Sequence, residues 1–381
     1  MIVQKRKLED VIISIQATKP KRIVVKIGSS SLTSLHGEIS RKKLEKLVEQ
    51  LVKLKDNGYE VLLVSSGAVA AGYRKLGFLE RPTSLPEKQA AASIGQGLLM
   101  EAYSDLFLSH GYVASQILIT RGDFSDETRY NNVRNTINVL VDRGIIPIIN
   151  ENDTVTVDRL RFGDNDTLSA KVAGLVGADF LTVLSDIDGL YTDNPVKNPE
   201  ATRIELVRSI TPEIEAAAGD AGSAVGTGGM KSKLDAFRIA MASGIKGFLG
   251  DATTEDIIYR SVMGEADGTY FEADQDMDYL NRKKQWIAFN SGPVGEIIMK
   301  NDGRIPDSVE FQNISTIKGN FKKGDVVRIL DERGARIGLG IVNQAASELW
   351  QALASPVRNI EETIVGQESF VCELEHTVPI R

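Results

Sequence analysis

The sequence predicts an α/β protein in which a mostly parallel sheet is sandwiched by helices, followed by a small β-barrel-like domain. Up to Gly268, short strands that are apolar throughout alternate with helices of 3.6-residue periodicity. This alternation is typical of a parallel sheet that is covered on both faces. After an acidic stretch at residues 272–282, short segments of alternating polarity are separated by Gly and Asp turns, as in small barrels and sandwiches.

The elements of the first part follow from their apolar patterns. A strand is expected at residues 22–27, and a helix at 41–57 keeps its apolar residues on one face and ends at Gly58. Four more apolar strands are expected at residues 61–64, 114–118, 145–149 and 180–184. The other helices include residues 90–92, 129–143, 167–176 and 234–243. In the second part, strand-like segments are residues 295–300, 309–314, 325–330 and 335–342.

These changes of pattern divide the chain into four segments. Residues 1–19 form an N-terminal extension, and Leu8, Val11 and Ile15 fall on one face of the helix predicted there. The α/β domain, the linker and the β-rich domain are predicted at residues 20–275, 276–284 and 285–381.

Composition narrows the class of protein. The chain has 381 residues, 42% hydrophobic and 25% charged, which is enough for a sizeable core. Its net charge of −7 argues against nucleic acid or a membrane surface as a partner of the whole chain. Cys372 is the only cysteine, which fits a reducing compartment, and no apolar run reaches the ~20 residues of a membrane span. The histidines are too widely spaced for zinc. We therefore expect a cytoplasmic protein without a metal site of its own.

Two loops that follow predicted strands contain glycine beside small polar residues. Lys26 and Gly28 end the first strand, where backbone N–H groups and an ammonium group together suit a phosphate. A strand-end lysine is also commonly a solvated charge, and the Gly-Lys-Ser/Thr order of a Walker loop is absent. Ser66 and Gly67 follow the second strand and would present backbone amides to a ligand, although a tight strand-to-helix turn explains them as well. Ligands of open α/β sheets bind beyond the carboxyl ends of strands, so these loops could share one site.

A third region is the most polar part of the chain. Asn150 and Asp153 follow a buried strand, and Asp164, Asn165 and Asp166 precede a helix. Such carboxylates and amides could bind the ammonium group of an amino acid and orient lysines. An Asx cap or turn explains one or two of these residues but not both clusters.

A fourth region joins Ser185 and Asp186 to the glycine-rich residues 226–233. Lys231 and Lys233 fall where a helix is expected to begin, although the helix dipole is positive there. A bound polyphosphate would remove this conflict. The alternative is a mobile, solvated loop.

Together these segments resemble the amino-acid kinase family and, within it, the kinases that act on glutamate. The matching strings occur in the family's order at residues 24–30, 64–72, 150–153, 162–166, 184–191 and 226–230. The tail from Arg282 is similar to the RNA-associated PUA domain at residues 295–297 and 318–327, and departs from it at 302–307 and 343–347.

The resemblance implies an ATP-dependent kinase that phosphorylates the γ-carboxylate of L-glutamate, the first step of proline biosynthesis, with feedback inhibition by proline. It implies that Lys26 and Lys233 flank the transferred phosphoryl group and that Asp166 holds both lysines. The residues implied for glutamate are Ser66, Gly67, Asn150, Asp153, Asp164 and Asn165. Those implied for ATP, which brings Mg²⁺, are Lys26, Gly28, Ser185, Asp186, Thr227, Gly228, Gly229, Met230, Lys231, Ser232 and Lys233. A homo-oligomer is expected, and specific RNA binding is not.

This reaction fits the candidate residues, which include two lysines and an aspartate but no catalytic histidine or cysteine. A carboxylate acceptor needs no general base, so positioning and neutralisation of phosphoryl charge suffice. The alternatives are a kinase for aspartate or N-acetylglutamate, which residues 162–166 and the tail argue against, and an RNA-binding protein on a decayed kinase scaffold. The acidic pI and intact Lys26, Asp166 and Lys233 argue against the latter. A bifunctional pyrroline-carboxylate synthetase would need a dehydrogenase domain, for which the chain has no room.

Overall fold

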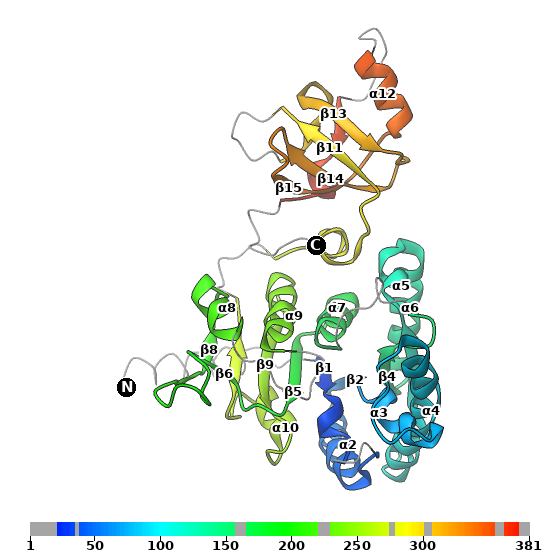
Figure 1. Ribbon diagram of the computed structural model, residues 1–381, viewed down its shortest axis with the longest axis vertical. Coiled ribbons are helices and arrows are strands. Elements are labelled where there is room, and N and C mark those ends of the chain that lie inside the picture. Colours follow the sequence, from blue (N-terminus) through cyan, green and yellow to red (C-terminus); the bar gives the residue numbers. More distant parts are fainter. Residues whose placement is uncertain are drawn as a thin grey trace. The chain divides into compact units, whose positions relative to one another are not determined.

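The computed structural model describes residues 21–34, 38–156, 165–219, 229–273, 279–300, 307–354 and 362–372. The chain divides into two compact units (Figure 1). The first unit contains Met1–Asp123 and Thr128–Asp278, and the second contains Phe124–Glu127 and Tyr279–Arg381. The helix predicted at residues 1–19 lies outside the described residues, and the limits proposed for the linker remain a prediction.

An eight-stranded sheet forms the centre of the first unit, in the order β3-β4-β2-β1-β5-β9-β10-β8. The strands are β1 (Arg22–Ile27), β2 (Glu60–Ser65), β3 (Ala114–Ile119), β4 (Ile146–Glu151), β5 (Phe180–Ser185), β8 (Leu206–Val207), β9 (Lys246–Asp251) and β10 (Thr269–Phe271). The strands from β3 to β9 in this order pair in parallel, and β10 pairs antiparallel with β9. The prediction of a mostly parallel sheet is therefore confirmed.

Helices cover both faces of this sheet (Figure 1). One face carries α2 (Arg41–Asp56) and α10 (Ile257–Val262), and the other carries α7 (Asn165–Val176) and α9 (Met230–Ala242). The remaining helices before α9 in the chain are α3 (Ala68–Gly72), α4 (Leu85–Ser109), α5 (Arg121–Ser125), α6 (Glu127–Asp142) and α8 (Pro212–Gly219). The end of α5 and the first residue of α6 fall in the segment Phe124–Glu127 of the second unit. Small elements connect them: η1 (Ser29–Ser31), η2 (Tyr73–Leu76), β6 (Leu190–Tyr191) and β7 (Arg203–Ile204). Within the described residues, no helix is long and apolar enough to cross a membrane.

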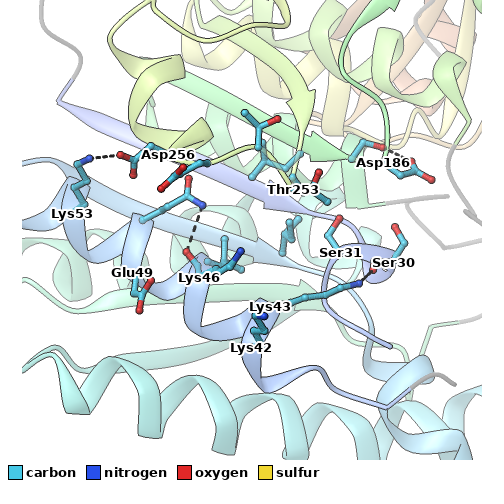
Figure 2. A pocket seen from close by; sticks show the side chains of 18 residues that line it. Ser30, Ser31, Lys42, Lys43, Lys46, Glu49, Lys53, Asp186, Thr253 and Asp256 are labelled. Atoms are coloured by element: carbon cyan, nitrogen blue, oxygen red, sulfur yellow. Dashed lines mark hydrogen bonds and ion pairs between the residues drawn. The ribbon is translucent and has the colours of Figure 1, made fainter. Parts of the chain in front are cut away.

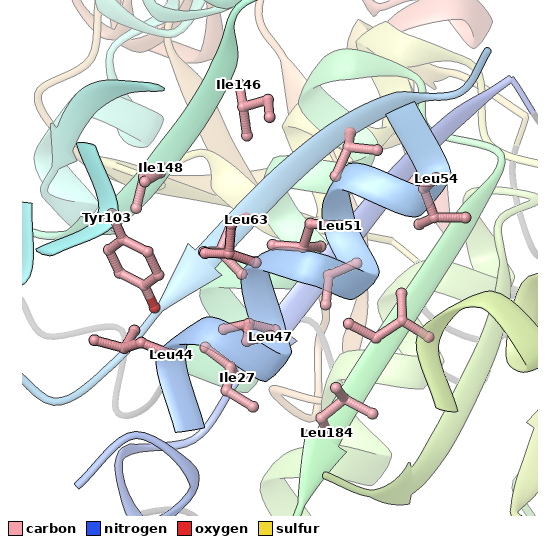
Figure 3. Close-up of a cluster of buried hydrophobic side chains, with 14 of the residues drawn as sticks. Ile27, Leu44, Leu47, Leu51, Leu54, Leu63, Tyr103, Ile146, Ile148 and Leu184 are labelled. Atoms are coloured by element: carbon pink, nitrogen blue, oxygen red, sulfur yellow. The ribbon is translucent and has the colours of Figure 1, made fainter. Parts of the chain in front are cut away.

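The core on the α2 face sets the orientation of β1 (Figure 3). Leu44, Leu47 and Leu51 of α2 pack in one buried cluster with Ile27 of β1 and Leu63 of β2. Burying a leucine or isoleucine side chain stabilises a fold by about 1.5–3 kcal/mol. Because side chains alternate along a strand, placing Ile27 in this cluster directs the preceding side chain to the opposite face of the sheet.

The strand order also places a topological switch point at β1. From β1 the chain continues to β2 on one side, and β5 later pairs with the other side of β1. Ligands of open α/β sheets bind beside such a switch point. The loops after β1, β2, β4 and β5 therefore lie where the sequence predicts a common site.

The second unit is rich in β-structure. Its five-stranded sheet has the order β13-β11-β14-β15-β17, and β12 pairs with β16. The strands are β11 (Gly295–Met299), β12 (Val309–Glu310), β13 (Ile314–Gly319), β14 (Val326–Asp331), β15 (Arg336–Ile341), β16 (Thr363–Val365) and β17 (Phe370–Cys372). The helices and turns are α11 (Arg282–Gln285), η4 (Trp286–Asn290), η5 (Phe311–Asn313), α12 (Ala346–Ala354) and η6 (Gln367–Ser369).

One expectation for this unit was wrong, and one helix was not predicted. Residues 309–314 do not form one strand, because the 3-10 turn η5 separates β12 from β13. The tail also contains the helix α12, whose Ala346, Leu349 and Ala352 are buried. Their spacing of three residues places them on one helical face, as expected for a helix that packs on a core.

Candidate active site

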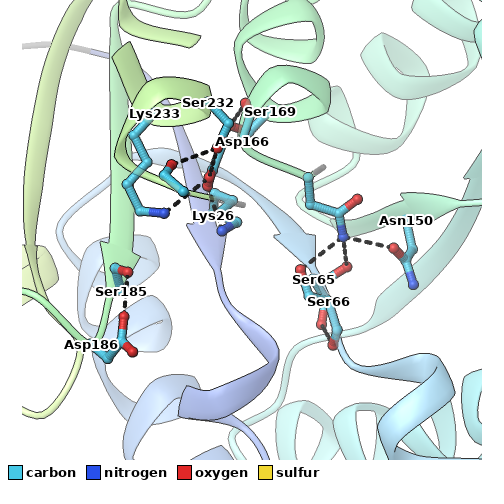
Figure 4. A network of polar contacts seen from close by, with 12 residues as sticks. Lys26, Ser65, Ser66, Asn150, Asp166, Ser169, Ser185, Asp186, Ser232 and Lys233 are labelled. Atoms are coloured by element: carbon cyan, nitrogen blue, oxygen red, sulfur yellow. Dashed lines mark hydrogen bonds and ion pairs between the residues drawn. The ribbon is translucent and has the colours of Figure 1, made fainter. Parts of the chain in front are cut away.

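Three buried ionisable side chains meet at the edge of the sheet (Figure 4). Lys26 Nζ lies 2.5 Å from Asp166 Oδ1, and Lys233 Nζ lies 3.2 Å from Asp166 Oδ2. Asp166 is 0% exposed, and the two lysines are 6% and 5% exposed. Ser232 Oγ donates a hydrogen bond of 3.1 Å to Asp166 Oδ2. Lys26 is therefore not the solvated surface charge that its position in the sequence also allowed.

The three side chains come from three different elements. Lys26 is on β1, Asp166 is in the first turn of α7, and Lys233 is near the start of α9. Both helices begin earlier than the sequence suggested, at Asn165 instead of residue 167 and at Met230 instead of residue 234. The positive end of the α7 dipole favours Asp166, whereas that of α9 disfavours Lys233. The Asp166 carboxylate offsets this second, unfavourable placement.

The ion pairs decide the protonation state of Asp166. Burial alone would raise its pKa, because a carboxylate loses its hydration. The ammonium groups of Lys26 and Lys233 outweigh burial through charge attraction and hydrogen bonding, so the pKa of Asp166 lies below its usual value. Asp166 is consequently an ionised carboxylate at neutral pH.

Gly28 leaves space beside the Lys26 ammonium group. Its backbone is extended, with φ −78° and ψ 157°. A Cβ at this position would lie 3.9 Å from Lys26 Nζ and 3.8 Å from the carbonyl oxygen of Leu184. These are ordinary contacts, so the fold itself does not require glycine here. A side chain at this position would instead occupy space next to the cation, where an anion can approach.

A network of uncharged groups lies beside the ionic cluster (Figure 4). Asn165 Nδ2 lies 2.9 Å from the carbonyl oxygen of Ser65, 2.8 Å from Ser66 Oγ and 3.0 Å from Asn150 Oδ1. Asn150 is 3% exposed and donates through Nδ2 to Gln96 Oε1 at 2.9 Å. The network thus connects the ends of β2 and β4 to the start of α7. An amide NH₂ has only two hydrogens, so it satisfies at most two of the three oxygens at once.

The turn after β2 needs glycine for a conformational reason. Gly67 has φ 102° and ψ 4°, a left-handed conformation that side chains with a Cβ rarely adopt. A Cβ on Gly67 would also lie 3.7 Å from Ser29 Cβ. The Ser66-Gly67 turn therefore lies against the loop that follows β1.

Helices α3 and α4 touch through their backbones directly behind this turn. A Cβ on Gly72 would lie 1.9 Å from the carbonyl oxygen of Ala91, and one on Gly95 would lie 1.8 Å from that of Ala68. Neither position can accept a larger residue unless the helices move apart. Because Gln96 follows Gly95, this contact also sets how closely Gln96 approaches Asn150.

Sequence reasoning missed three residues of this region. Gln96 and Tyr103 lie within the long helix α4, and Tyr103 OH is 2.9 Å from Ser65 Oγ. Burial raises the pKa of Tyr103, so its phenol remains neutral. Gly95 was also missed. A glycine within an otherwise helical stretch was the only feature that could have pointed to this close contact.

The structure describes only some of the remaining predicted site residues, and these differ in how exposed they are. Ser185 Oγ donates to Asp186 Oδ1 at 2.9 Å at the end of β5, and the Asp186 side chain is exposed. Asp153 is half-buried in the turn after β4. Gly229 is the N-cap of α9, which contains Met230, Lys231 and Ser232. Asp164, Thr227 and Gly228 lie outside the described residues.

No carboxylate cage for a metal ion is evident in the part of the chain that the structure describes. Groups of three or more His, Cys, Asp or Glu side chains suited to a metal are absent there. Asp166, which lies closest to the lysines, already pairs with both of them. We therefore assign no protein ligand to Mg²⁺.

Comparison with known proteins identifies relatives of this chain. The model of the amino acid kinase family matches residues 21–251. Glutamate 5-kinase 2 of Bacillus subtilis (strain 168) is 66% identical, over 95% of this chain and 99% of the relative. Glutamate 5-kinase 2 of Bacillus licheniformis (strain ATCC 14580) is also 66% identical, over 94% and 99%. A glutamate 5-kinase of Bacillus cereus (strain ATCC 10987) is 44% identical, over 95% and 100%.

Among solved structures, a carbamate kinase from Giardia lamblia bound to AMP-PNP is 18% identical. It covers 67% of this chain and 99% of its own, with a TM-score of 0.49. The family match covers more than half of the chain, and the Bacillus relatives match over nearly its whole length. The chain therefore belongs to the amino acid kinase family.

Proposed function

We propose that the protein transfers the γ-phosphoryl group of ATP to the γ-carboxylate of L-glutamate, giving L-glutamyl 5-phosphate and ADP in the first step of proline biosynthesis. The observation that carries the proposal is the buried cluster of Lys26, Asp166 and Lys233 beside an uncharged amide network. The names of relatives that are 66% identical over nearly the whole chain support glutamate as the acceptor.

In this proposal the ionic cluster receives the donor. Lys26 and Lys233 meet the negative charge of the transferred phosphoryl group, and Gly28 lets the phosphate approach Lys26 closely. Ser185 and Asp186 line the nucleotide at the end of β5. The remaining contacts to ATP are proposed for the segment from Thr227 through Gly228, Gly229, Met230, Lys231 and Ser232 to Lys233.

The acceptor is proposed to bind at the amide network. Ser66, Gly67, Asn150 and Asn165 come from three loops that the network holds together. Because Asn165 satisfies two of its three neighbouring oxygens at most, one oxygen remains to accept a hydrogen bond from the substrate's ammonium group. Asp153 and Asp164 supply the negative charge that this ammonium group needs.

The chemical step then needs little beyond position and charge. A γ-carboxylate oxygen attacks the γ-phosphorus in line, a new O–P bond forms, and the bond to the β,γ-bridging oxygen breaks with ADP as the leaving group. No proton moves, because a carboxylate is already ionised at neutral pH. Asp166 takes no part in bond making; it holds the two ammonium groups where phosphoryl charge develops. Mg²⁺ is proposed to enter bound to the phosphates of ATP, which it neutralises in part.

An ADP-release assay over a panel of amino acids tests this function, with hydroxylamine to trap the acyl phosphate. L-glutamate should give the highest kcat/KM and a hydroxamate product. Equal or better turnover of aspartate or N-acetylglutamate would assign the enzyme to another acceptor. ADP release without hydroxamate would exclude acyl phosphate formation.

Proline is proposed to inhibit by competing with glutamate, since it carries the same α-carboxylate and an ammonium group for the amide network. Raising glutamate should relieve inhibition by millimolar proline in initial-rate measurements, and unchanged rates at that concentration would contradict the proposal.

We further propose that residues 285–381 form a PUA-like domain that is not needed for the chemistry and does not bind specific RNA, and that the enzyme is a cytoplasmic homo-oligomer. A truncation after Leu280 that folds but is inactive would contradict the first point.

A further inference from the structure

A groove of about 950 Å³ lies on the α2 face of the sheet (Figure 2). One wall is α2 and the other is the loop at residues 252–256, which follows β9. Ile27, Leu47 and Leu184 form an apolar floor. A hydroxyl-rich rim is contributed by Ser30, Ser31, Ser185, Thr253 and Thr254.

This groove is separate from the phosphoryl-transfer cluster. Ile27 belongs to the core on the α2 face, and the preceding Lys26 points to the other face because side chains alternate along β1. The groove adjoins the proposed nucleotide site at Ser185 and Asp186, which follow β5 and are the two lining residues that the proposed reaction assigns to ATP. None of Lys26, Asp166 and Lys233 is among the residues that line the groove.

One end of the groove is strongly cationic. Lys42, Lys43 and Lys46 of α2 line it beside the η1 turn. Lys43 Nζ donates to the carbonyl oxygens of Ser30 and Thr33, both at 2.8 Å, so its charge is held in place without a carboxylate. Lys42 and Lys46 are exposed, and neither has an ion-pair partner among the residues that the structure describes.

The other end differs in charge and is closed. Lys53 Nζ forms an ion pair of 2.6 Å with Asp256 Oδ2 across the groove. Gln50 Oε1 accepts a hydrogen bond of 3.0 Å from the backbone N–H of Ile258. Glu49 and Glu255 add negative charge at this end. Among the residues that the structure describes, an elongated ligand would thus meet lysines without a carboxylate partner only at its η1 end.

A solvated helix face does not account for the three lysines as well as a ligand does. Lys42 and Lys43 lie in the first turn of α2, which carries no acidic residue. The positive end of the helix dipole disfavours cations there. An anion beside them would reverse the sign of this interaction.

We propose that the groove binds a second ligand, a small organic phosphate, distinct from both substrates of the proposed reaction. Its phosphate lies between Lys42, Lys46 and the hydroxyls of Ser30 and Ser31, because lysine meets phosphate as a point charge. Its organic part covers the floor of Ile27, Leu47 and Leu184. The ligand belongs to a class with a single phosphate at one end, since the opposite end of the groove is acidic.

Binding in the groove would affect the phosphoryl-transfer cluster through Lys43. Of the two carbonyl groups that Lys43 holds, that of Ser30 belongs to the η1 turn, which directly follows Gly28, and that of Thr33 lies just after this turn. A phosphate that attracts the Lys43 ammonium group would shift this turn and hence the loop beside Lys26. The groove is therefore an effector site for this enzyme.

The experiment uses inorganic phosphate and ribose 5-phosphate as probes, with the full chain saturated with AMP-PNP and glutamate to occupy the substrate sites. Binding is followed by ³¹P NMR line broadening and by hydrogen exchange of the η1 turn. Lys42→Met/Lys46→Met is compared with Lys75→Met, which removes an exposed lysine that does not line the groove. Circular dichroism checks that each variant is folded, and the two single variants replace the double variant if it is not.

The wild type and Lys75→Met should bind at least ribose 5-phosphate saturably, with slower exchange in the η1 turn. Lys42→Met/Lys46→Met should bind about tenfold more weakly or worse, because two charged contacts are lost. Three results would overturn the proposal: saturable binding of neither probe, equal affinity in the double variant, or saturable binding that occurs only in a parallel titration without AMP-PNP. The last would show that the groove is part of the donor site.

Discussion

Asn165 and Asp166 are neighbours in the chain, yet they organise two different kinds of site. Asp166 joins two ammonium groups in an ionised, buried cluster, whereas Asn165 joins hydroxyl, carbonyl and amide oxygens without any charge. The ionic half suits a group whose charge changes during reaction. The uncharged half suits recognition of a fixed shape. The start of one helix, α7, thus positions both halves relative to each other.

The comparison predicts that the ionic half contributes most to stability. Asp166→Asn leaves two buried ammonium groups without their carboxylate, and breaking a buried pair typically costs about 3–5 kcal/mol. The pKa of Asp166 is lowered in the fold, so its stabilisation is present above the unfolded-state pKa of about 3.9 and is lost as pH falls through the lower, folded value.

Urea unfolding of the wild type and Asp166→Asn at pH 7 and at a series of lower pH values checks this sign. The difference in free energy of unfolding should be largest at pH 7 and shrink in acid. A difference that grows in acid would mean that Asp166 is not ionised in the fold. Asp105→Asn, an exposed aspartate of α4, serves as the control.

Substitutions in the two halves should also affect different kinetic constants. Lys233→Ala should lower kcat by on the order of 10²–10³, because a preorganised charge contact to the transition state is lost. Its KM for glutamate should change much less. Steady-state kinetics with varied glutamate and ATP measure both, and an effect confined to KM would assign Lys233 to ground-state binding instead.

The contact behind the uncharged half can be broken without touching a polar group. Gly95→Ala forces a Cβ against the Ala68 carbonyl oxygen, and overpacking of this kind costs about 1–3 kcal/mol. Gly97→Ala is the matched control in the same helix, because a Cβ there meets nothing within 4 Å. Thermal unfolding should show a loss for Gly95→Ala and no loss for Gly97→Ala. Equal melting temperatures would mean that α3 and α4 separate at no cost.

The smallest effect is expected within the amide network itself. Asn150→Ala removes one acceptor of Asn165 and the partner of Gln96. The KM for glutamate should rise about tenfold, since one or two neutral hydrogen bonds contribute about 0.5–1.5 kcal/mol each, while kcat stays within a few-fold. A loss of kcat as large as that of Lys233→Ala would remove the distinction between the halves.

The sequence was sufficient for the elements whose apolar pattern is long or continuous. Strands β1, β2, β4 and β5 and helix α2 lie within a few residues of their predicted limits. The strands are buried on both faces of the sheet and are therefore continuously apolar, and the apolar residues of α2 recur with helical periodicity. The starts of α7 and α9 were placed too late, since polar and glycine residues there carry no periodicity. Helix α12 was missed although its buried residues are spaced three apart.

The residues of the candidate site also differ in how far the sequence could predict them. Lys26, Asp166 and Lys233 lie far apart in the sequence, and only the family resemblance grouped them. Gln96 and Tyr103 could not be foreseen, because a polar residue within a helix shows its function only through the residue opposite. That residue is Asn150 for Gln96 and Ser65 for Tyr103.

The pairing of β1 fixes which face of the sheet Lys26, the lysine of the proposed transfer site, can reach. Lys26 is in register with Val64 on one side and Val183 on the other, and the odd-numbered Ile23, Val25 and Ile27 fill the core on the α2 face. Deleting one residue within β1 would exchange odd and even positions and place the ammonium group among leucines. The proposed activity therefore depends on Lys26 occupying an even-numbered position of β1. A lysine at position 25 or 27 would have the same chemistry but would point to the α2 face of the sheet.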